Sequence, residues 1–315
     1  MKLIIYMPAL NEEKTIQQVI SNLPRKLDDI DIIQILVIDD GSTDKTAALA
    51  LSCDAQVVSH LKNMGVGSAF HSALQFALEN DADILVSIDA DGQFDPMDIP
   101  ALIKPIIARK ADMVIGNRFT LDAPAFMPRL KYWGNKKVAQ LISYVSGQEF
   151  QDVSCGFRSY SREALLHLNL FGIFTYTHET ILSLVFQGLR IIERPIIIRY
   201  FPDRKSKVAL SIFNYAIQTS KIIFRVFLDY RPIRFFGTLG SLFTFIGLGF
   251  EVFLLGYYAF TQDFSPYISL GFIGLGLIIF GLLVLLIALI ADMLNRSRIT
   301  QDKILYELKK IRYDK

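Results

Sequence analysis

Short apolar runs alternate with longer amphipathic stretches along the first 120 residues. The apolar runs predict strands over residues 3–8, 33–39, 56–59, 84–89 and 113–116. The stretches between them predict helices, which cover residues 12–23, 43–51, 66–79 and 96–109. Alternation of this kind, with units of about 20 to 30 residues, is typical of a parallel sheet that carries helices on both faces. We therefore predict an α/β domain.

A long apolar block follows near the C-terminus. Residues 235–291 contain only two charged side chains, Glu251 and Asp263. The block divides into residues 235–260 and 267–291, and each part is long enough to cross a hydrocarbon core of about 30 Å. We predict a hairpin of two transmembrane helices; the alternative is a buried helical hairpin in a soluble protein. Outside the block the charge content is ordinary for a globular protein, which excludes disordered, collagen-like and coiled-coil chains.

Basic residues flank the block on both sides. Residues 199–234 hold eight basic and two acidic side chains, and residues 292–315 hold seven basic and four acidic side chains. The loop that connects the two spans, at 261–266, has no Lys or Arg. The positive-inside rule then predicts an inner-membrane protein with both termini and the large domain in the cytoplasm. The expected organisation is a catalytic domain over 1–208, an amphipathic helix on the membrane over 209–234, the two spans, and a basic tail over 292–315. A helix packed on the domain is the alternative for 209–234.

The two spans carry features that favour contacts between helices. Glu251 is expected to face protein rather than lipid, because an acidic group is costly in a hydrocarbon environment. Gly271, Gly274 and Gly276 allow close approach of a neighbouring helix. We expect a homo-oligomer.

Polar motifs follow three of the predicted strands. They are 8–12 after the first strand, 39–44 after the second and 89–93 after the fourth. Ligands of open α/β sheets bind beyond the carboxyl ends of the strands. Asp89 and Asp91 supply hard oxygen ligands, which Mg²⁺ and Mn²⁺ prefer. We therefore predict a divalent-cation site at this edge of the sheet.

Two other pairs of aspartates have the same spacing, at 29–31 and 81–83, and we expect them on solvated turns or helix ends. Asp39 ends a strand, where its carboxylate can accept hydrogen bonds from a ribose or a base. Ser42 and Thr43 need not contact a ligand; the alternative is that they only cap the N-terminus of the next helix.

Six motifs of this chain resemble those of family 2 glycosyltransferases with the GT-A fold, and they occur in the same order. More narrowly, the chain is similar to polyprenyl-phosphate glycosyltransferases, namely dolichyl-phosphate mannose synthases and bactoprenol glucosyltransferases. The resemblance covers residues 1–207, and the paired spans match the bactoprenol branch. The motifs are Pro8-Ala-Leu-Asn-Glu12, Asp39-Asp-Gly-Ser-Thr-Asp44, Asn63-Met-Gly-Val-Gly67, Asp89-Ala-Asp-Gly-Gln93, Gly116-Asn-Arg118-Phe and Asp152-Val-Ser-Cys-Gly156-Phe-Arg158.

The resemblance implies a GT-A, Rossmann-like domain for nucleotide-diphosphate sugars, joined to the transmembrane hairpin. It also implies a role for each matched position. Asp91 and Gln93 would hold Mg²⁺ or Mn²⁺, with Asp89 bridging to the metal or the donor. Arg118 would lie near a phosphate, and Asp152 would orient or assist the reaction. The donor site would comprise Pro8, Leu10, Glu12, Asp39, Asp89 and Ala90.

Cations for a phosphate acceptor are expected in two segments. The basic, proline-broken loop at 120–137 suits an anionic lipid head, with Arg129 or Lys131 as ligands; a solvated surface loop is the alternative. In relatives the catalytic domain ends with the motif R-x-x-G-x-S/T-K. The corresponding segment of this chain, residues 203–207, keeps Ser-Lys but has no glycine, and its arginine stands at a different position. Lys207 is therefore a safer phosphate ligand than Arg204.

The expected reaction is transfer of a hexose, from UDP-glucose, to polyprenyl phosphate with inversion. The lipid phosphate is largely dianionic at neutral pH, so it needs little deprotonation. The alternatives are a GDP-mannose-dependent mannosyltransferase and a non-enzymatic membrane anchor or flippase subunit. A flippase is an expected partner, and nucleic acid is not. A processive polysaccharide synthase is disfavoured because it would need more spans and a Q-x-x-R-W helix, and Trp133 is the only tryptophan. An oxidoreductase is disfavoured because no glycine fingerprint follows the first strand.

Overall fold

The computed structural model describes residues 1–120, 127, 129–169, 176–199, 220–221, 224, 227–228 and 232–313, with only the backbone at 129–130. Two compact units divide the chain. The first comprises Met1–Ile223 together with Leu305–Lys315, and the second comprises Phe224–Ile304. Arg204 and Lys207 lie outside the described residues, and so does most of the predicted amphipathic helix. Between 209 and 230 the structure describes only 220–221, 224 and 227–228, and these residues are helical.

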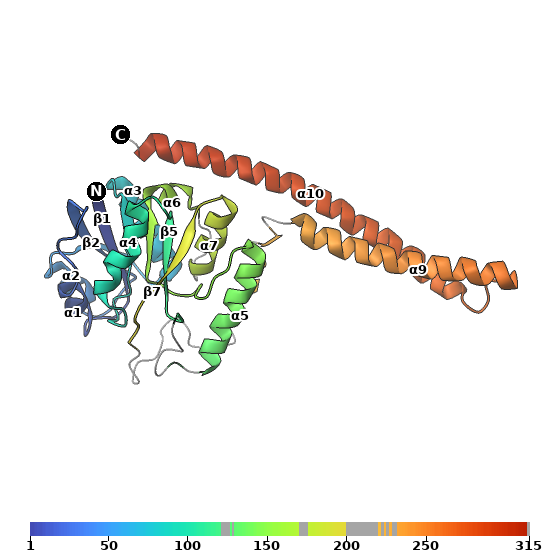
Figure 1. Cartoon of the computed structure of the whole chain (residues 1–315), viewed down its shortest axis with the longest axis horizontal. Coiled ribbons are helices and arrows are strands. Elements are labelled where there is room, and N and C mark those ends of the chain that lie inside the picture. Colours follow the sequence, from blue (N-terminus) through green and yellow to red (C-terminus); the bar gives the residue numbers. More distant parts are fainter. Residues whose placement is uncertain are drawn as a thin grey trace. The chain divides into compact units, whose positions relative to one another are not determined.

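A seven-stranded sheet forms the centre of the first unit (Figure 1), in the order β3-β2-β1-β4-β6-β5-β7. All neighbouring strands are parallel except β6, which runs antiparallel to β4 and β5. The antiparallel β6 corrects the expectation of a parallel sheet, and the α/β class is as expected. The strands are β1 (Lys2–Ala9), β2 (Ile32–Asp39), β3 (Gln56–Ser59), β4 (Ile84–Ser87), β5 (Met113–Asn117), β6 (Arg158–Ser161) and β7 (Ile191–Pro195).

Apolar side chains of the central strands form the core. Leu3, Ile4 and Ile5 of β1 and Val114 and Ile115 of β5 are completely buried. Helix α3 packs on β1 and β2, whereas α4 packs on β4, β5 and β6. The helices of this unit are α1 (Ile16–Ser21), α2 (Thr46–Leu51), α3 (Val66–Glu79), α4 (Ile99–Ile107), α5 (Arg129–Ser146), α6 (Arg162–His167) and α7 (Thr177–Phe186).

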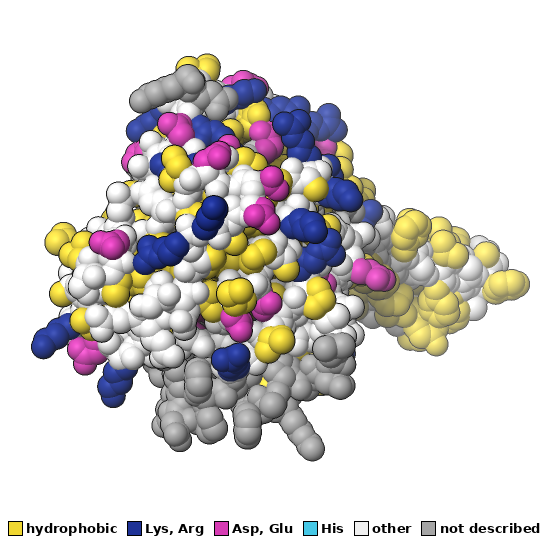
Figure 2. Space-filling view, turned by 60° about the vertical axis from the view of Figure 1, so that its left-hand side comes forward, with side chains coloured by type: hydrophobic (Ala, Val, Ile, Leu, Met, Phe, Trp, Pro, Cys, Tyr) yellow, Lys and Arg dark blue, Asp and Glu magenta, His cyan; other side chains and the backbone are white. Residues whose placement is uncertain are grey.

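Two long helices make up most of the second unit. α9 (Thr238–Thr261) and α10 (Ile268–Tyr313) are long and apolar enough to cross a membrane, by length and composition. Most side chains on the visible surface of this hairpin are hydrophobic, whereas charged groups are spread over the first unit (Figure 2). α10 continues as one helix through the predicted basic tail. The tail is therefore an extension of the second apolar helix.

Glycines bring α9 and α10 close together. A Cβ atom added to Gly247 would lie 2.6 Å from the carbonyl oxygen of Gly274. The carboxylate of Glu251 also lies against Gly274, with Oε1 2.9 Å from the position of a Cβ there. Glu251 therefore faces protein, as expected. A Cβ added to Gly276 would meet nothing within 4 Å, so Gly276 is not part of this contact.

The last turns of α10 belong to the first unit. Tyr306 donates a hydrogen bond to Glu163 over 3.3 Å, and its ring lies 4.2 Å from the ring of His167. Lys309 donates to the carbonyl oxygen of Leu168 over 2.8 Å. These contacts join residues 305–313 to α6 and the residue that follows it.

Candidate functional site at the carboxyl edge of the sheet

The direction of β6 determines which loops meet at one edge of the sheet. β1, β2, β4 and β5 are parallel, so the segments that follow them emerge at the same edge. Because β6 is antiparallel to β4 and β5, it begins where they end. The segment before β6, which contains Asp152, therefore reaches the same edge as Asp89 and Arg118.

The loops after β1 and β2 are interlocked by hydrogen bonds. Asn11 adopts a left-handed conformation with φ of 52°. Its N–H donates to Ser42 Oγ over 2.9 Å, and its Oδ1 accepts from the N–H of Thr43 over 2.8 Å. The N–H of Glu12 donates to Thr46 Oγ1 over 2.8 Å. The two predicted donor loops are thus one hydrogen-bonded unit.

The other predicted donor residues lie around these loops. Pro8 and Leu10 are half-buried, and Asp39 is buried at the end of β2. Asp39 Oδ1 accepts from the N–H of Ser42 over 3.0 Å. The buried Ala90 contributes its carbonyl oxygen, which accepts from Thr15 Oγ1 over 2.9 Å. The structure therefore brings the predicted donor residues to one place.

Asp40 supports the second loop, a role that the sequence did not suggest. It is buried and accepts from the N–H groups of Met64 and Gly65 over 2.9 and 2.8 Å. Its Oδ1 also lies 2.7 Å from His60 Nδ1. Gly41 completes the contact, because a Cβ there would lie 2.5 Å from the backbone of the neighbouring loop. The sequence Asp39-Asp40-Gly41 is the signal that could have indicated this support of one loop by the other.

The predicted cation ligands lie just past β4. Asp89 and Asp91 are half-buried, and Asp91 Oδ1 accepts from the N–H of Gln93 over 3.0 Å. Gly156 leaves room for the Asp89 carboxylate, since a Cβ on it would lie 3.2 Å from Oδ1. Within the described part of the chain, no three His, Cys, Asp or Glu side chains gather into a metal-binding group. Two carboxylates and an amide suit a cation such as Mg²⁺, which takes its other ligands from water and substrate phosphates.

The two similar aspartate pairs lie elsewhere. Asp31 binds the N-terminal amine, and Asp83 accepts from the N–H of Lys2 over 2.6 Å. Lys2 begins β1, so both pairs lie at the opposite edge of the sheet. Their placement agrees with the expectation that they lie on turns or helix ends.

Arg118 and Asp152 form a bidentate ion pair. Arg118 Nε lies 2.6 Å from Asp152 Oδ2, and Nη2 lies 2.7 Å from Oδ1. Asp152 is completely buried, and 7% of the Arg118 side chain is exposed. Arg118 Nη2 also donates to Ser154 Oγ over 2.8 Å. Asp152 therefore fixes the orientation of the guanidinium group.

Glu193 of β7 holds the segment that carries Asp152, and sequence reasoning missed it. Its carboxylate accepts from the N–H groups of Asp152 and Gln151 over 2.7 and 3.0 Å. It also accepts from Asn117 Nδ2 over 3.3 Å, next to Arg118. Burial raises the pKa of Glu193, and these hydrogen bonds oppose the rise. No strand was expected here, so no signal placed this carboxylate at the site.

Lys131, which was expected in a loop over 120–137, lies in the first turn of helix α5. Burial lowers the pKa of its ammonium group, and the positive charge of Arg118 adds to the effect. Asp91, Asp152 and Asp89 act in the opposite direction. The charge of Lys131 thus interacts with the charges of Arg118 and of these three aspartates. The side chain of Arg129 is outside the described part of the chain.

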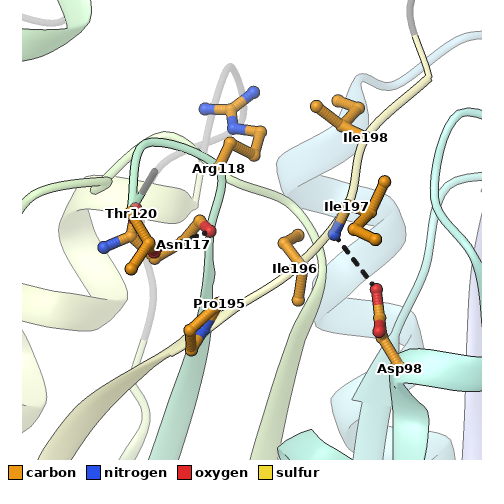
Figure 3. A pocket seen from close by; sticks show the side chains of 8 residues that line it. All are labelled: Asp98, Asn117, Arg118, Thr120, Pro195, Ile196, Ile197 and Ile198. Atoms are coloured by element: carbon orange, nitrogen blue, oxygen red, sulfur yellow. Dashed lines mark hydrogen bonds between the residues drawn. The ribbon is translucent and has the colours of Figure 1, made fainter. Parts of the chain in front are cut away.

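A pocket of about 430 Å³ opens beside Arg118 (Figure 3). Asp98 supports one wall, because its Oδ2 accepts from the N–H of Ile197 over 3.2 Å. Arg118 lies on one side of the pocket and Ile196, Ile197 and Ile198 on another. The sequence did not predict this pocket. Its lining consists of Asp98, Asn117, Arg118, Thr120, Pro195, Ile196, Ile197 and Ile198.

The sheet, the acidic pair past β4 and the clustered cations define a GT-A glycosyltransferase. Residues 4–168 match glycosyl transferase family 2, and the chain belongs to this family.

The curated relatives include several proteins of Haloferax volcanii. Glycosyltransferase AglJ is 28% identical over 308 residues, which cover 96% of this chain and 97% of the relative. A dolichyl-phosphate hexose transferase is 30% identical over 229 residues, which cover 73% and 95%.

Among solved structures, glucosyl-3-phosphoglycerate synthase from Mycobacterium tuberculosis matches with a TM-score of 0.57 and 22% identity, over 72% of this chain and 79% of that one. That structure is a complex with Mn²⁺, uridine-diphosphate-glucose and phosphoglyceric acid. At this level of identity the match shows a shared fold.

Proposed function

We propose that this chain transfers a hexose from a nucleotide-diphosphate sugar, UDP-glucose, to polyprenyl phosphate. The product is a polyprenyl-monophosphate sugar with an inverted anomeric centre, made on the cytoplasmic face of the membrane. The dolichyl-phosphate hexose transferase among the relatives supports a lipid-phosphate acceptor. The solved complex with UDP-glucose and Mn²⁺ supports the donor and the divalent cation.

The observation that carries the proposal is the meeting of Asp89 with the ion pair of Arg118 and Asp152 at one edge of the sheet, where Gly156 leaves room for the Asp89 carboxylate. Lys131 adds a second cation, whose charge interacts with Arg118 and with the three aspartates at positions 89, 91 and 152. A donor diphosphate bound through a cation at the aspartates would lie near both positive side chains. A second phosphate could then be held by Lys131 while the first is held by the metal.

The chain's own residues would act mainly by positioning. The interlocked loops after β1 and β2 would hold the nucleotide, and Lys131 and Arg118 would hold the acceptor phosphate in line with the anomeric carbon. The acceptor oxygen forms a bond to that carbon as the bond to the diphosphate breaks. When bound, Mg²⁺ or Mn²⁺ supplies charge stabilisation to the departing diphosphate. We assign the pocket beside Arg118 to the acceptor, because three isoleucines form one wall.

Asp152 is a positioning residue in this scheme. Both of its oxygens are engaged by Arg118, and Oδ1 also lies 3.3 Å from the N–H of Ser154. The oxygens of this carboxylate are therefore used to orient Arg118 and the neighbouring backbone. The nucleophile does not need a strong base, because the phosphate is already largely ionised.

The membrane arrangement is supported by the end of α10. Residues 305–313 contact the catalytic domain through Tyr306 and Lys309. If both long helices cross a membrane, the segments before and after them would lie on the same side of it. The basic flanks favour the cytoplasmic side.

The test uses the full-length protein in detergent, with undecaprenyl phosphate, Mg²⁺ and a panel of donors that includes UDP-glucose and GDP-mannose. We expect release of UDP and formation of a hexosyl lipid, detected by mass spectrometry, and loss of activity with a chelator. Asp91→Ala should lower the rate by about a hundredfold or more, because charge stabilisation of the leaving group is lost. Asp81→Ala, in the pair at the opposite edge, is the matched control.

Three outcomes would contradict the proposal in different ways. Transfer from GDP-mannose alone would replace the donor. Full activity of both Asp91→Ala and Asp152→Asn would overturn the site. Absence of nucleotide release with every donor would favour a non-enzymatic anchor.

A further inference from the structure

A chain of three side chains joins the loop after β2 to helix α3. His60 follows β3 and lies in the middle: its Nδ1 is 2.7 Å from Asp40 Oδ1, and its Nε2 is 2.9 Å from Ser72 Oγ. Only 9% of the His60 side chain and 8% of the Asp40 side chain are exposed. Both nitrogens of a nearly buried imidazole ring are therefore hydrogen-bonded, and the scheme of the proposed reaction uses neither contact.

The chemistry of the three groups determines the direction of these hydrogen bonds. A carboxylate only accepts, so His60 Nδ1 carries the hydrogen and donates to Asp40. In the neutral ring, Nε2 then accepts from the hydroxyl group of Ser72. Ser72 thus fixes the orientation of the imidazole ring, and the ring fixes the orientation of the Asp40 carboxylate.

The Asp40 carboxylate in turn holds the segment that leads into α3. It accepts from the N–H groups of Met64 and Gly65 over 2.9 and 2.8 Å. His60 and Met64 share the Oδ1 atom, whereas Gly65 bonds to Oδ2. Without the imidazole, Oδ1 would keep a single donor among the described residues. Hydrogen bonds to an ionised acceptor are stronger than neutral ones, so this loss weakens the hold on both loops.

The same contacts surround Asp39, which was predicted to accept hydrogen bonds from a ribose or a base. The backbone N–H of His60 donates to the carbonyl oxygen of Asp39 over 2.8 Å, and the N–H of Asp40 donates to that of Ala9 over 2.9 Å. Gly41 lies against the next loop, since an added Cβ would be 2.5 Å from the carbonyl carbon of Lys62. The position of Asp39 therefore depends on how the loops after β2 and β3 are held together.

We propose that His60 is a positioning residue for the nucleotide of the sugar donor, and that it acts through Asp40 on the loop after β2. The class of ligand, a nucleoside diphosphate, rests on the proposed function. The side chain of His60 bonds to Asp40 and Ser72 and not to the residues of the cation site. Its loss should therefore weaken nucleotide binding more than it slows the chemical step.

Two variants separate the two ends of the imidazole ring. In His60→Asn the amide nitrogen takes the place of Nδ1, so the hydrogen bond to Asp40 is kept and the contact with Ser72 is lost. In His60→Gln the amide group reaches the place of Nε2, so the contact with Ser72 is kept and the hydrogen bond to Asp40 is lost.

Nucleotide binding to the full-length protein in detergent is measured by calorimetry in the presence of Mg²⁺. The probe is UDP or GDP, whichever the wild type binds more tightly. We expect His60→Gln to bind this nucleotide about tenfold more weakly, and His60→Asn to stay within about threefold of the wild type. His71→Gln, the same substitution at an exposed position of α3, is the matched control and should bind like the wild type.

Steady-state kinetics separates positioning from a merely structural role. His60→Gln should raise KM for the donor about tenfold and change kcat by less than about threefold. Partial unfolding would instead lower the apparent kcat and leave KM unchanged, because the molecules that remain folded are normal. An unchanged KM with a lower apparent kcat would therefore overturn the proposal.

Three results of the binding experiment would also overturn it. One is undiminished nucleotide binding by His60→Gln. Another is equal weakening in His60→Asn, which would show that the ring itself is needed and not its hydrogen bond to Asp40. The third is a wild type that binds neither UDP nor GDP. Failure of the proposed function alone looks different, because the wild type would then bind nucleotide, His60→Gln would bind it more weakly, and no sugar would reach a lipid phosphate.

Discussion

Glu193 shows how much of the site depends on a residue that contacts no expected substrate. Its carboxylate holds the backbone on both sides of the Arg118–Asp152 pair, through Asp152 N–H and Asn117 Nδ2. Hydrogen bonds to a charged acceptor contribute about 1.5–3 kcal/mol each when they are made in a protein. A neutral amide in this place would accept fewer of them.

Replacing Glu193 by Gln should therefore lower kcat by about ten- to a hundredfold, since it loosens the segment that carries Asp152. UDP binding, measured by calorimetry, should change little because the loops around Asn11 do not contact Glu193. The matched control is Glu149→Gln, an exposed glutamate two residues before Gln151. Equal loss of activity in both variants would argue against the positioning role.

His178 gives the domain a dependence on pH. It is fully buried in α7, and no described residue hydrogen-bonds to its Nε2. Burial, aided by the charge of Arg158, lowers its pKa from 6.5 to about 3. The unfolded chain therefore binds a proton below about pH 6.5 while the folded domain does not, and stability falls as the pH drops from 6.5 towards 3.

We expect the wild type to lose roughly 1–2 kcal/mol of stability from this residue between pH 7.5 and 5.5. His178→Leu should lose less over the same interval, as followed by thermal unfolding with circular dichroism. His71→Gln, at an exposed position of α3, serves as the control and should respond to acid like the wild type. An identical acid response in His178→Leu would assign the effect to other groups.

At the level of elements, the contact between α9 and α10 depends on particular glycines. Gly247 touches α10, whereas a Cβ on Gly249 would meet nothing within 4 Å. Both residues lie in the same helix, two positions apart. They differ only in what surrounds them.

Gly247→Ala should destabilise the hairpin by about 1–3 kcal/mol, because the new methyl group overlaps the backbone of α10. Gly249→Ala should be neutral or slightly stabilising, because alanine has the higher helix propensity. Thermal unfolding in detergent, followed at the helical signal, compares the two. A lower midpoint for Gly249→Ala than for Gly247→Ala would show that the helices do not meet at Gly247.

The sequence predicted those elements whose pattern is repeated and apolar. The first five strands follow apolar runs, and α3 begins and ends where it was expected, at Val66 and Glu79. β6 was missed because Arg158-Ser-Tyr-Ser161 is a polar run, and its polar groups are buried only because other segments satisfy them. Arg158 donates to the carbonyl oxygens of Cys155 and Val153 over 2.6 and 2.8 Å. Such partners come from tertiary structure, which periodicity does not report.

The site was predictable to a similar extent. Asp39, which ends a strand, and Asp89, which lies just past one, were indicated because parallel strands end at one edge. Arg118 was implied only by the resemblance to the family. Asp40 and Glu193 were not found, because their roles depend on which backbone groups lie opposite them. The roles of all these residues in catalysis stay predictions.

For the whole molecule, the contact of residues 305–313 with the catalytic domain is the feature to test. Tyr306 contributes both a ring contact to His167 and a hydrogen bond to Glu163. Tyr306→Ala should weaken this docking by about 1–2 kcal/mol, from the loss of both contacts. Faster hydrogen exchange at α6 would report the weakening.

Ile311→Ala is the control for this experiment. Ile311 lies in the same helix and 76% of it is exposed, so its removal should leave exchange at α6 unchanged. Unaltered exchange in Tyr306→Ala would show that the end of α10 adds nothing to the stability of the domain.

That same contact also sets an order of events during synthesis. The ribosome makes residues 1–223 first, then both long apolar helices, and only afterwards residues 305–313. The contacts of Tyr306 and Lys309 with the catalytic domain can form only after the hairpin has left the ribosome. A newly made domain therefore completes its fold after the apolar helices have had the opportunity to enter a bilayer.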